Sequence, residues 1–240
     1  MIHSPITAHS SVLDSKSLIA AEHSLIWRKE FKVIIWLLLM SAIPIVAGLV
    51  RLTELAVNAQ VTSANLRFIS QPIPIVIHLL SSICFSLLAP FQFSKTIRRR
   101  QLRWHRYSGM LLILSGLFIA ITGIWMSIVF SLPVSDPPPL QIVRLIVALA
   151  LVVAILNALY AIAHKNIRAH EIWMIRAYAI AMGAATQVIT HLPWVLLFGP
   201  PDGWVRFFLM TLGWVINIVT AEIIIRTVMK PVGGQYDIIK

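Results

Sequence analysis

Long apolar stretches alternate with short polar segments along the whole chain. Six apolar stretches recur, at residues 31–50, 72–91, 107–131, 140–163, 172–197 and 205–225. About 20 apolar residues in a helix cross the roughly 30 Å of hydrocarbon in a bilayer. Because lipid offers the backbone no hydrogen-bond partner, such segments must be helical. The pattern predicts an all-α integral membrane bundle of six transmembrane helices.

Proline and glycine punctuate the connections between these stretches. Pro133 and the run 137–139 separate the third stretch from the fourth, and the sequence at 199–203 (GPPDG) forms a turn between the fifth and sixth. No connection is long enough to hold a soluble domain. We therefore divide the chain into an N-terminal segment at 1–30, a transmembrane domain at 31–226 and a tail at 227–240.

The composition agrees with a membrane protein. Hydrophobic residues make up 58% of the chain and charged residues 12%, with a mean hydropathy of +0.85, whereas soluble domains carry about 25% charged residues. A net charge of +11 would suggest nucleic acid in a soluble protein. Here the expected partner is the lipid bilayer, because the basic residues fall in loops beside apolar stretches. The single cysteine, Cys84, cannot form an internal disulfide.

The basic residues also predict an orientation. Sixteen of the twenty Lys and Arg residues fall on the side of the membrane that holds both termini. The other side holds only Arg51, Arg67, Arg144 and Arg206. By the positive-inside rule, both termini are expected in the cytoplasm, and the protein in the cytoplasmic (inner) membrane.

Two histidines lie at matched depth near the outer face. His78 is six residues into the second stretch and His191 is about six residues before the end of the fifth, so both lie roughly 9 Å below the outer edge. Two imidazoles at one depth could ligate a haem iron from opposite faces. The alternative is two structural histidines, each hydrogen-bonded to neighbours such as Ser81, Ser82 or Gln187.

A second histidine group is expected at the cytoplasmic side. His105 opens the third stretch, His164 closes the fourth, and His170 with Glu171 opens the fifth. These side chains could hold a metal, or one pair of histidines could hold a second haem. The alternative is interfacial histidines that meet water and lipid phosphate.

The third stretch carries small residues every seven positions. Gly109, Gly116 and Gly123 lie on one stripe of the helix, each preceded by Ser or Thr. The stripe favours close helix packing, with a slot for a flat ring as the alternative. In the sixth stretch, Glu222 and Arg226 are one turn apart and are expected to form an ion pair.

Two clusters of motifs resemble a known family. The first contains His78, Cys84, LAPFQF at 88–93, IRRR at 97–100, His105, Arg106 and Gly109. The second contains His170, Trp173, Met174, Arg176, Tyr178 and Ala179. Over residues 72–190 this pattern is similar to an uncharacterised family of bacterial polytopic membrane proteins, described only as a predicted membrane domain of unknown function. The resemblance marks six candidate functional positions: His78, Gln92, His105, Arg106, His170 and Arg176. Gly109 and Trp173 are further positions of the motifs.

The leading functional hypothesis is a b-type haem protein that passes electrons across the membrane between a donor and an acceptor. In this hypothesis His78 and His191 ligate an outer haem iron, and His105 with His170 (or His164) ligates an inner one. Six spans with histidines near both faces resemble two-haem b-type cytochromes in architecture, although the helix pairing differs from theirs. Two alternatives stay open: a transporter or channel for a small solute, and a membrane scaffold without a cofactor. The chain contains no catalytic motif of high specificity.

Overall fold

The computed structural model describes residues 6–57, 60–62 and 65–229, and the regular elements in this part of the chain are helices. In chain order they are α1 (Ile6–Ala56), α2 (Leu66–Ser70), α3 (Pro72–Gln92), α4 (Lys95–Arg100), α5 (Leu102–Val129), α6 (Pro138–Ala163), α7 (Ile167–Ala181), α8 (Gly183–Phe198) and α9 (Gly203–Val228). The prediction of an all-α protein is confirmed for the described residues.

Five helices are individually long and apolar enough to cross a membrane: Trp27–Ala56 within α1, and α3, α5, α6 and α9. The pair α7 and α8 passes the same test only when taken together, and the two are bent by 41° at Met182. The stretch 172–197, expected as one helix, is therefore a broken span. If the bent pair is counted as one span, the structure has six candidate transmembrane spans, the number predicted from the sequence.

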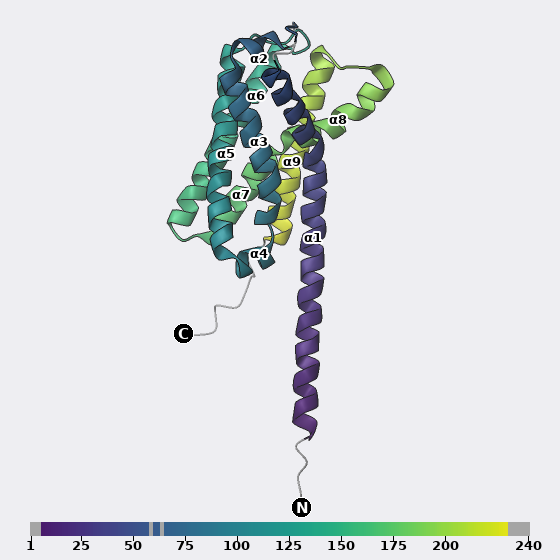
Figure 1. Ribbon diagram of the computed structural model, residues 1–240, viewed down its shortest axis with the longest axis vertical. Helices are drawn as coiled ribbons and strands as arrows, with labels where there is room; N and C mark the ends of the chain where they lie inside the picture. The colour runs from purple at the N-terminus through teal and green to yellow at the C-terminus, as the bar shows by residue number, and fades with distance from the viewer. Residues whose placement is uncertain (1–5, 58–59, 63–64, 230–240) are drawn as a thin grey trace, which may run out of the picture.

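The first span continues an N-terminal helix without interruption. α1 runs from Ile6 to Ala56, so the chain is helical across residue 30, where the sequence suggested a boundary. The N-terminal half of α1 projects beyond the rest of the bundle (Figure 1). Near that point, Glu30 accepts hydrogen bonds from the Ser94 hydroxyl at 2.6 Å and from the backbone N–H of Lys95. These contacts tie α1 to the start of α4.

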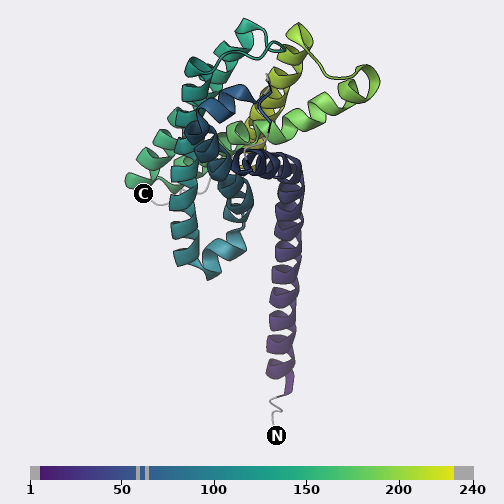
Figure 2. The same ribbon diagram turned by 45° about the horizontal axis from the view of Figure 1, so that its top comes forward.

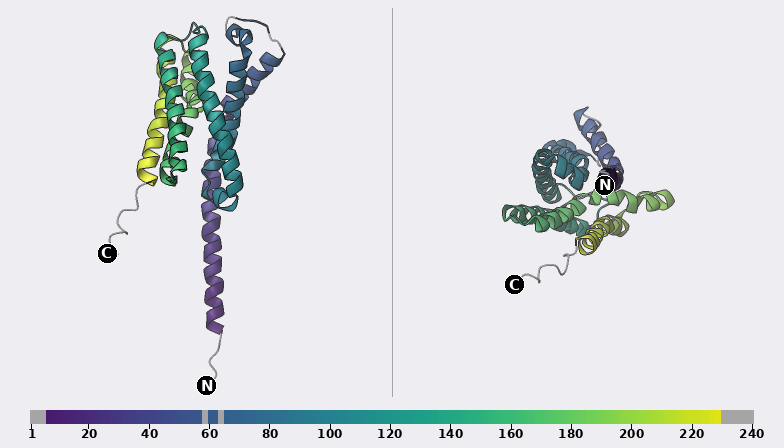
Figure 3. Two further views of the ribbon diagram at one scale, coloured as in Figure 1. Left: turned by 90° about the vertical axis from the view of Figure 1, so that its left-hand side faces the viewer. Right: turned by 90° about the horizontal axis from the view of Figure 1, so that it is seen from below.

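The spans pack as a closed series of neighbours. α1 packs on α3, α3 on α5, α5 on α6, and α6 on α7, while α8 reaches back to α1. α9 packs against both halves of the broken span. Seen from below, α7 and α8 run across the bundle between α9 and the helices α1 and α3 (Figure 3), and the tilted view shows α8 leaving the bundle beside α9 (Figure 2). This arrangement places the bend of the broken span inside the molecule.

Small side chains allow these close approaches. A core cluster joins α5, α6 and α7 through Ala120, Leu151, Ala154, Ile155, Ala177 and Ile180. The glycine stripe of α5 faces α3 at three levels: a Cβ on Gly109 would lie 3.5 Å from Gln92, on Gly116 3.5 Å from Phe85, and on Gly123 3.8 Å from His78. Gly116 also faces α6, where a Cβ would lie 2.7 Å from Ile155, so the stripe packs against both neighbouring helices.

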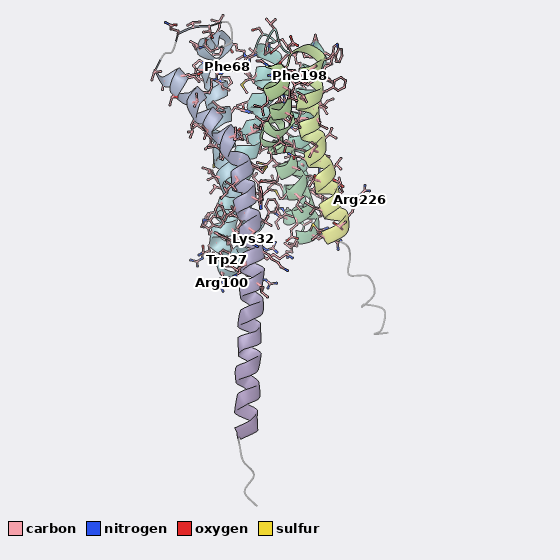
Figure 4. The ribbon with its side chains drawn as sticks, turned by 90° about the vertical axis from the view of Figure 1, so that its right-hand side faces the viewer. Trp27, Lys32, Phe68, Arg100, Phe198 and Arg226 are labelled. Carbon is pink, nitrogen blue, oxygen red and sulfur yellow. The ribbon has the colours of Figure 1, made fainter. Side chains whose placement is uncertain are left out.

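Charge separates the two ends of the bundle. Lys32, Arg100 and Arg226 lie at the end from which both termini emerge, together with Trp27, whereas Phe68 and Phe198 lie at the opposite end (Figure 4). We call the first the basic end. We call the second the arginine-cluster end, because Arg67, Arg144 and Arg206 lie there around Asp136.

Candidate functional site

A cavity of about 360 Å³ lies inside the bundle and reaches the arginine-cluster end. Its wall comes from α2, α3, α5, α6, both halves of the broken span, α9, and the loop that follows α5. The polar side chains of this wall include Arg67, His78, Ser82, Ser127, Ser131, Gln141 and Arg144. Pockets of roughly 300–1,000 Å³ with a few convergent polar groups are typical binding sites for small molecules.

His78 is fixed in the cavity wall by α5. Its Nδ1 atom lies 2.9 Å from the Thr122 hydroxyl oxygen, and that hydroxyl donates at 2.5 Å to the carbonyl oxygen of Phe118. The threonine oxygen is then the acceptor and Nδ1–H the donor, which leaves Nε2 of the neutral ring unprotonated. Gly123 lies beside the ring, and a Cβ at this position would be 3.8 Å from it, an ordinary contact.

The mouth of the cavity holds a buried carboxylate between two arginines. Asp136 lies in the loop between α5 and α6, and its side chain is fully buried. Its oxygens lie 2.5 Å from Arg206 Nε and 2.7 Å from Arg144 Nη2. Burial alone would raise the pKa of Asp136, but the hydrogen bond from Arg206 and the charge of Arg144 outweigh it and hold the pKa below its ordinary value.

Arg67 completes this group, which we call the arginine cluster: Arg67, Arg144 and Arg206 around Asp136. Arg67 lies over the Phe68 ring at 4.6 Å, and Arg51 approaches the same ring at 5.2 Å. Burial lowers the pKa of Arg67, the charge of Asp136 opposes this effect, and the charges of Arg144, Arg51 and Arg206 add to it. Among the described residues, the buried Nε of Arg67 has no hydrogen-bond partner.

Sequence reasoning missed the arginine cluster. It treated these arginines only as the minority of basic residues on one side. A signal was nevertheless present, since Arg144 and Arg206 lie within the first two turns of apolar helices, and Asp136 immediately precedes the proline run. An ionisable side chain that close to hydrocarbon requires a partner or a function.

The bend in the broken span borders the cavity. Ile180 and Ala181 from α7 and Ala184 from α8 line the wall on either side of Met182. Asn217 of α9 compensates for the interruption: its amide donates to the carbonyl oxygen of Ala179 at 3.1 Å, and its carbonyl accepts from Thr186 at 2.7 Å. The freed backbone is thus satisfied by a neighbouring helix, as membrane depth demands.

His191 lies in a second, mostly apolar hollow between α8 and α9. Its Nδ1–H donates to the carbonyl oxygen of Gln187 at 2.7 Å. His78 is in the wall of the first cavity and His191 in that of the second, and the two hollows share Ala184 and Met210 as lining residues. An outer haem held by both histidines stays a prediction.

Of the three histidines near the basic end, His105 and His170 lie near each other, whereas His164 makes separate contacts. His105 of α5 and His170 of α7 lie in the same neighbourhood as Arg98 and Glu171, which form an ion pair. His170 Nδ1–H donates to the Ala158 carbonyl at 2.9 Å, and His105 Nδ1 is buried without a partner in the described part of the chain. His164 instead stacks on Tyr160, with ring centroids 4.1 Å apart.

The residues that the sequence grouped as a possible inner metal site do not converge in the described part of the chain. Among the described residues, no group of three or more His, Cys, Asp or Glu side chains is arranged to hold a metal ion. The sequence grouped His105, His164, His170 and Glu171 by depth alone. In the structure His164 is held against its own helix, and Glu171 is occupied by Arg98. The four side chains are thus not brought together as one group, and a metal or haem at this end of the bundle stays a prediction.

Several of the other motif positions form packing contacts. Gln92 donates to the Ser108 hydroxyl at 2.7 Å beside Gly109. Arg176 stacks on Trp173 at 4.6 Å and forms a two-point ion pair with Glu222, with nitrogen–oxygen distances of 2.6 and 3.2 Å. Glu222 thus pairs across helices with Arg176, and the expectation of a pair with Arg226 was wrong. Arg106 is exposed.

A family model described as "Predicted membrane protein (DUF2306)" matches residues 75–225. The match begins within α3 and ends within α9, so it contains the cavity wall apart from α2. No curated protein and no solved structure matches the chain.

Proposed function

Since the matched segment is more than half of the chain, the protein belongs to this family of membrane proteins, and we propose that it carries a small solute across the cytoplasmic membrane. The solute binds in the cavity inside the bundle, reaching it from the arginine-cluster end. Transport of a small solute was one of the two alternatives to the haem hypothesis in the sequence analysis.

The observation that carries the proposal is the position of the helix break. The broken span lines the cavity on both sides of Met182, and interrupted helices beside a central site are typical of secondary transporters. Asn217 bonds to both halves of the broken span, to the Ala179 carbonyl of α7 and to the Thr186 hydroxyl of α8. A change in the 41° bend would alter the cavity wall without breaking either helix.

The charge distribution supports an orientation for this transporter. Lys32, Arg100 and Arg226 share the basic end (Figure 4), and the positive-inside rule assigns that end to the cytoplasm. In this orientation both termini are cytoplasmic and the mouth of the cavity faces outward.

Thiol accessibility tests the proposal without knowledge of the solute. In a Cys84→Ser background, Ser82→Cys places one thiol in the cavity wall, and Leu149→Cys places a control thiol on an exposed face of α6. A transporter must open the cavity to each side in turn. We expect a membrane-impermeant sulfonate thiol reagent to label Ser82→Cys in right-side-out and in inverted vesicles, and Leu149→Cys in neither. Labelling of Ser82→Cys from one side only, or from neither, would overturn the proposal.

The inner histidine pair supports a second candidate, a b-type haem protein that passes electrons between a donor and an acceptor. His105 and His170 lie on α5 and α7, and the bond from His170 Nδ1 to Ala158 leaves its Nε2 available as a ligand. The dithionite-reduced protein would then show the sharp absorption bands of six-coordinate haem. His105→Ala and His170→Ala should each remove them, and His164→Ala should not. A colourless, folded protein from haem-replete cells would refute this candidate.

A further inference from the structure

We propose that the solute carries an oxyanion, a carboxylate or a phosphate, on an apolar body, and that Arg67 and Arg144 bind the oxyanion at the cavity mouth. This inference rests on the proposed function and names the chemical class of its ligand.

The first argument is the balance of charge. Three guanidinium groups, from Arg67, Arg144 and Arg206, share one carboxylate. Asp136 is the one acid in the described part of the chain that forms ion pairs with this group. Glu54 is occupied by Arg51 at 2.5 Å, and Asp202 is exposed. Residues 58–59 and 63–64, which the structure does not describe, contain no acid. Among the described residues, two positive charges of the cluster are therefore left without a counter-ion.

The second argument is the state of Arg67. Its Nη1 reaches only the carbonyl oxygen of Ser131, at 3.5 Å, and its buried Nε has no partner among the described residues. A buried donor that lacks a partner is costly, although the rest of this half-buried side chain reaches water. The guanidinium therefore has donors to offer, in the planar arrangement that suits a carboxylate or phosphate.

The third argument is the role of Asp136. It holds Arg206 through Oδ1 and Arg144 through Oδ2, and in this way fixes Arg144 at the cavity wall. Arg206 lines the second hollow, so Arg67 and Arg144 are the arginines that face the first cavity. Two arginines held beside one opening are a preorganised oxyanion site.

The rest of the cavity wall is mostly apolar, which favours a ligand with an apolar body. The apolar part of the wall includes Phe68, Ile75, Phe130 and Trp214. Phe68 lies at the end of the bundle opposite the basic residues (Figure 4). An inorganic anion would leave this apolar space empty, whereas an amphipathic anion would fill both parts of the cavity.

Calorimetric titration of the full-length protein in detergent tests this assignment, with sodium octanoate, octyl phosphate and octan-1-ol as probes. We expect the two anions to bind and octanol to bind at least tenfold more weakly. Arg67→Gln and Arg144→Gln should each weaken anion binding about 10- to 100-fold, the range for one lost charge-assisted contact. The exposed Arg99→Gln at the basic end is the control and should bind as the unmodified protein does. The stronger of the two anions identifies the head group.

The outcomes separate this inference from the proposed function. Equal binding of octanol and octanoate, unchanged in both arginine variants, would overturn the oxyanion assignment but keep a ligand cavity. Arg67→Lys retains the charge and loses the planar fork, so weakened binding in this variant separates fork recognition from simple charge. If no probe binds and Ser82→Cys is unlabelled from both sides, the proposed function fails as well.

Discussion

Asp136 organises the arginine-cluster end from a single position. Its side chain is fully buried, while Arg144 and Arg206 are 27% and 28% exposed, so the acid is the least hydrated member of the group. Without it, three guanidinium groups would repel one another beside the bilayer. The loop that carries it is fixed in turn, because Gly203 N–H donates to the Ser135 carbonyl at 3.0 Å. One carboxylate therefore connects the α5–α6 loop with α6 and α9.

Asp136→Asn should destabilise the protein at neutral pH. Removal of one partner from a buried ion pair costs about 3–5 kcal/mol. Because Asn keeps an acceptor oxygen and both arginines retain access to water, we expect a loss of about 2 kcal/mol. For a chain of this size that loss corresponds to about 4–8 °C in Tm. Thermal unfolding in detergent measures the change, and an unchanged Tm would show that the pair contributes nothing.

The same variant should remove part of the acid sensitivity. The pKa of Asp136 is lower in the folded protein than its ordinary value of about 3.9. Its contribution to stability is therefore complete above that value and is lost as the pH falls through the folded pKa. The Tm of the unmodified protein should fall more steeply than that of Asp136→Asn as the pH is lowered below about 4. Parallel curves would contradict this assignment.

Thr122 is expected to matter through its hydroxyl rather than its shape. Thr122→Val removes the acceptor that His78 Nδ1–H uses at 2.9 Å. Side-chain hydrogen bonds between membrane helices contribute about 0.6 kcal/mol on average and up to about 1.7, so we expect a loss of about 1 kcal/mol. Unfolding in mixed micelles measures it. Thr122→Ser, which retains the acceptor, is the control, and an equal loss in both variants would point to packing instead.

The histidine predictions show what sequence can give at the residue scale. Rise per residue gives the depth of His78 and His191 along their helices, but not the direction in which each ring points. Rotation and helix order decide that His78 meets Thr122 and that His191 bonds to its own helix at Gln187. Depth alone could likewise not separate His164 from the pair formed by His105 and His170.

At the scale of elements, the broken span and α9 act as one unit. Gln187 donates to the carbonyl of Met210 at 3.1 Å, and Thr190 donates to that of Leu209 at 2.8 Å. Trp214 of α9 occupies the space beside Gly183, the first residue after the bend. A Cβ at this glycine would lie 2.1 Å from the indole ring, a distance that no packed structure tolerates. The absence of a side chain at Gly183 is therefore a condition for the α8–α9 contact.

Two glycine substitutions should differ strongly in effect. Gly183→Ala meets the rigid Trp214 ring, whereas Gly116→Ala, at 2.7 Å, meets the flexible end of Ile155. We expect Gly183→Ala to cost about 2–3 kcal/mol, in the upper range for overpacking, and Gly116→Ala about 1 kcal/mol or less. Trp214→Leu in the Gly183→Ala background should recover part of the loss. Equal losses in the two single variants, or no recovery, would contradict this account of the packing.

Hydropathy located the spans well but not the bend. Apolar residues continue through Met182 and Gly183, so a window over 172–197 gives no indication of an interruption. The cause lies on another helix, where Trp214 and Asn217 replace the contacts of a continuous span. A break that depends on a tertiary neighbour leaves only a weak local signal, here a single glycine.

At the scale of the molecule, the two ends carry charge in different ways. The basic end has many exposed cations, such as Arg99 and Arg106, which suit a surface of anionic lipid. The opposite end has few cations, and three of them surround a buried acid at the mouth of a cavity. The asymmetry of charge was readable from the sequence. The convergence of Arg67, Arg144 and Arg206 was not, because they come from helices far apart in the chain.

The orientation itself is the last prediction. In the Cys84→Ser background, Val134→Cys places an exposed thiol in the loop between α5 and α6, and Arg99→Cys places one in α4 at the basic end. Because short loops rich in Lys and Arg stay in the cytoplasm, an impermeant maleimide added to intact spheroplasts should label Val134→Cys. It should label Arg99→Cys only after permeabilisation. The reverse pattern would place the cavity mouth in the cytoplasm, so that the solute would first bind from inside the cell, and it would do so without affecting the oxyanion site.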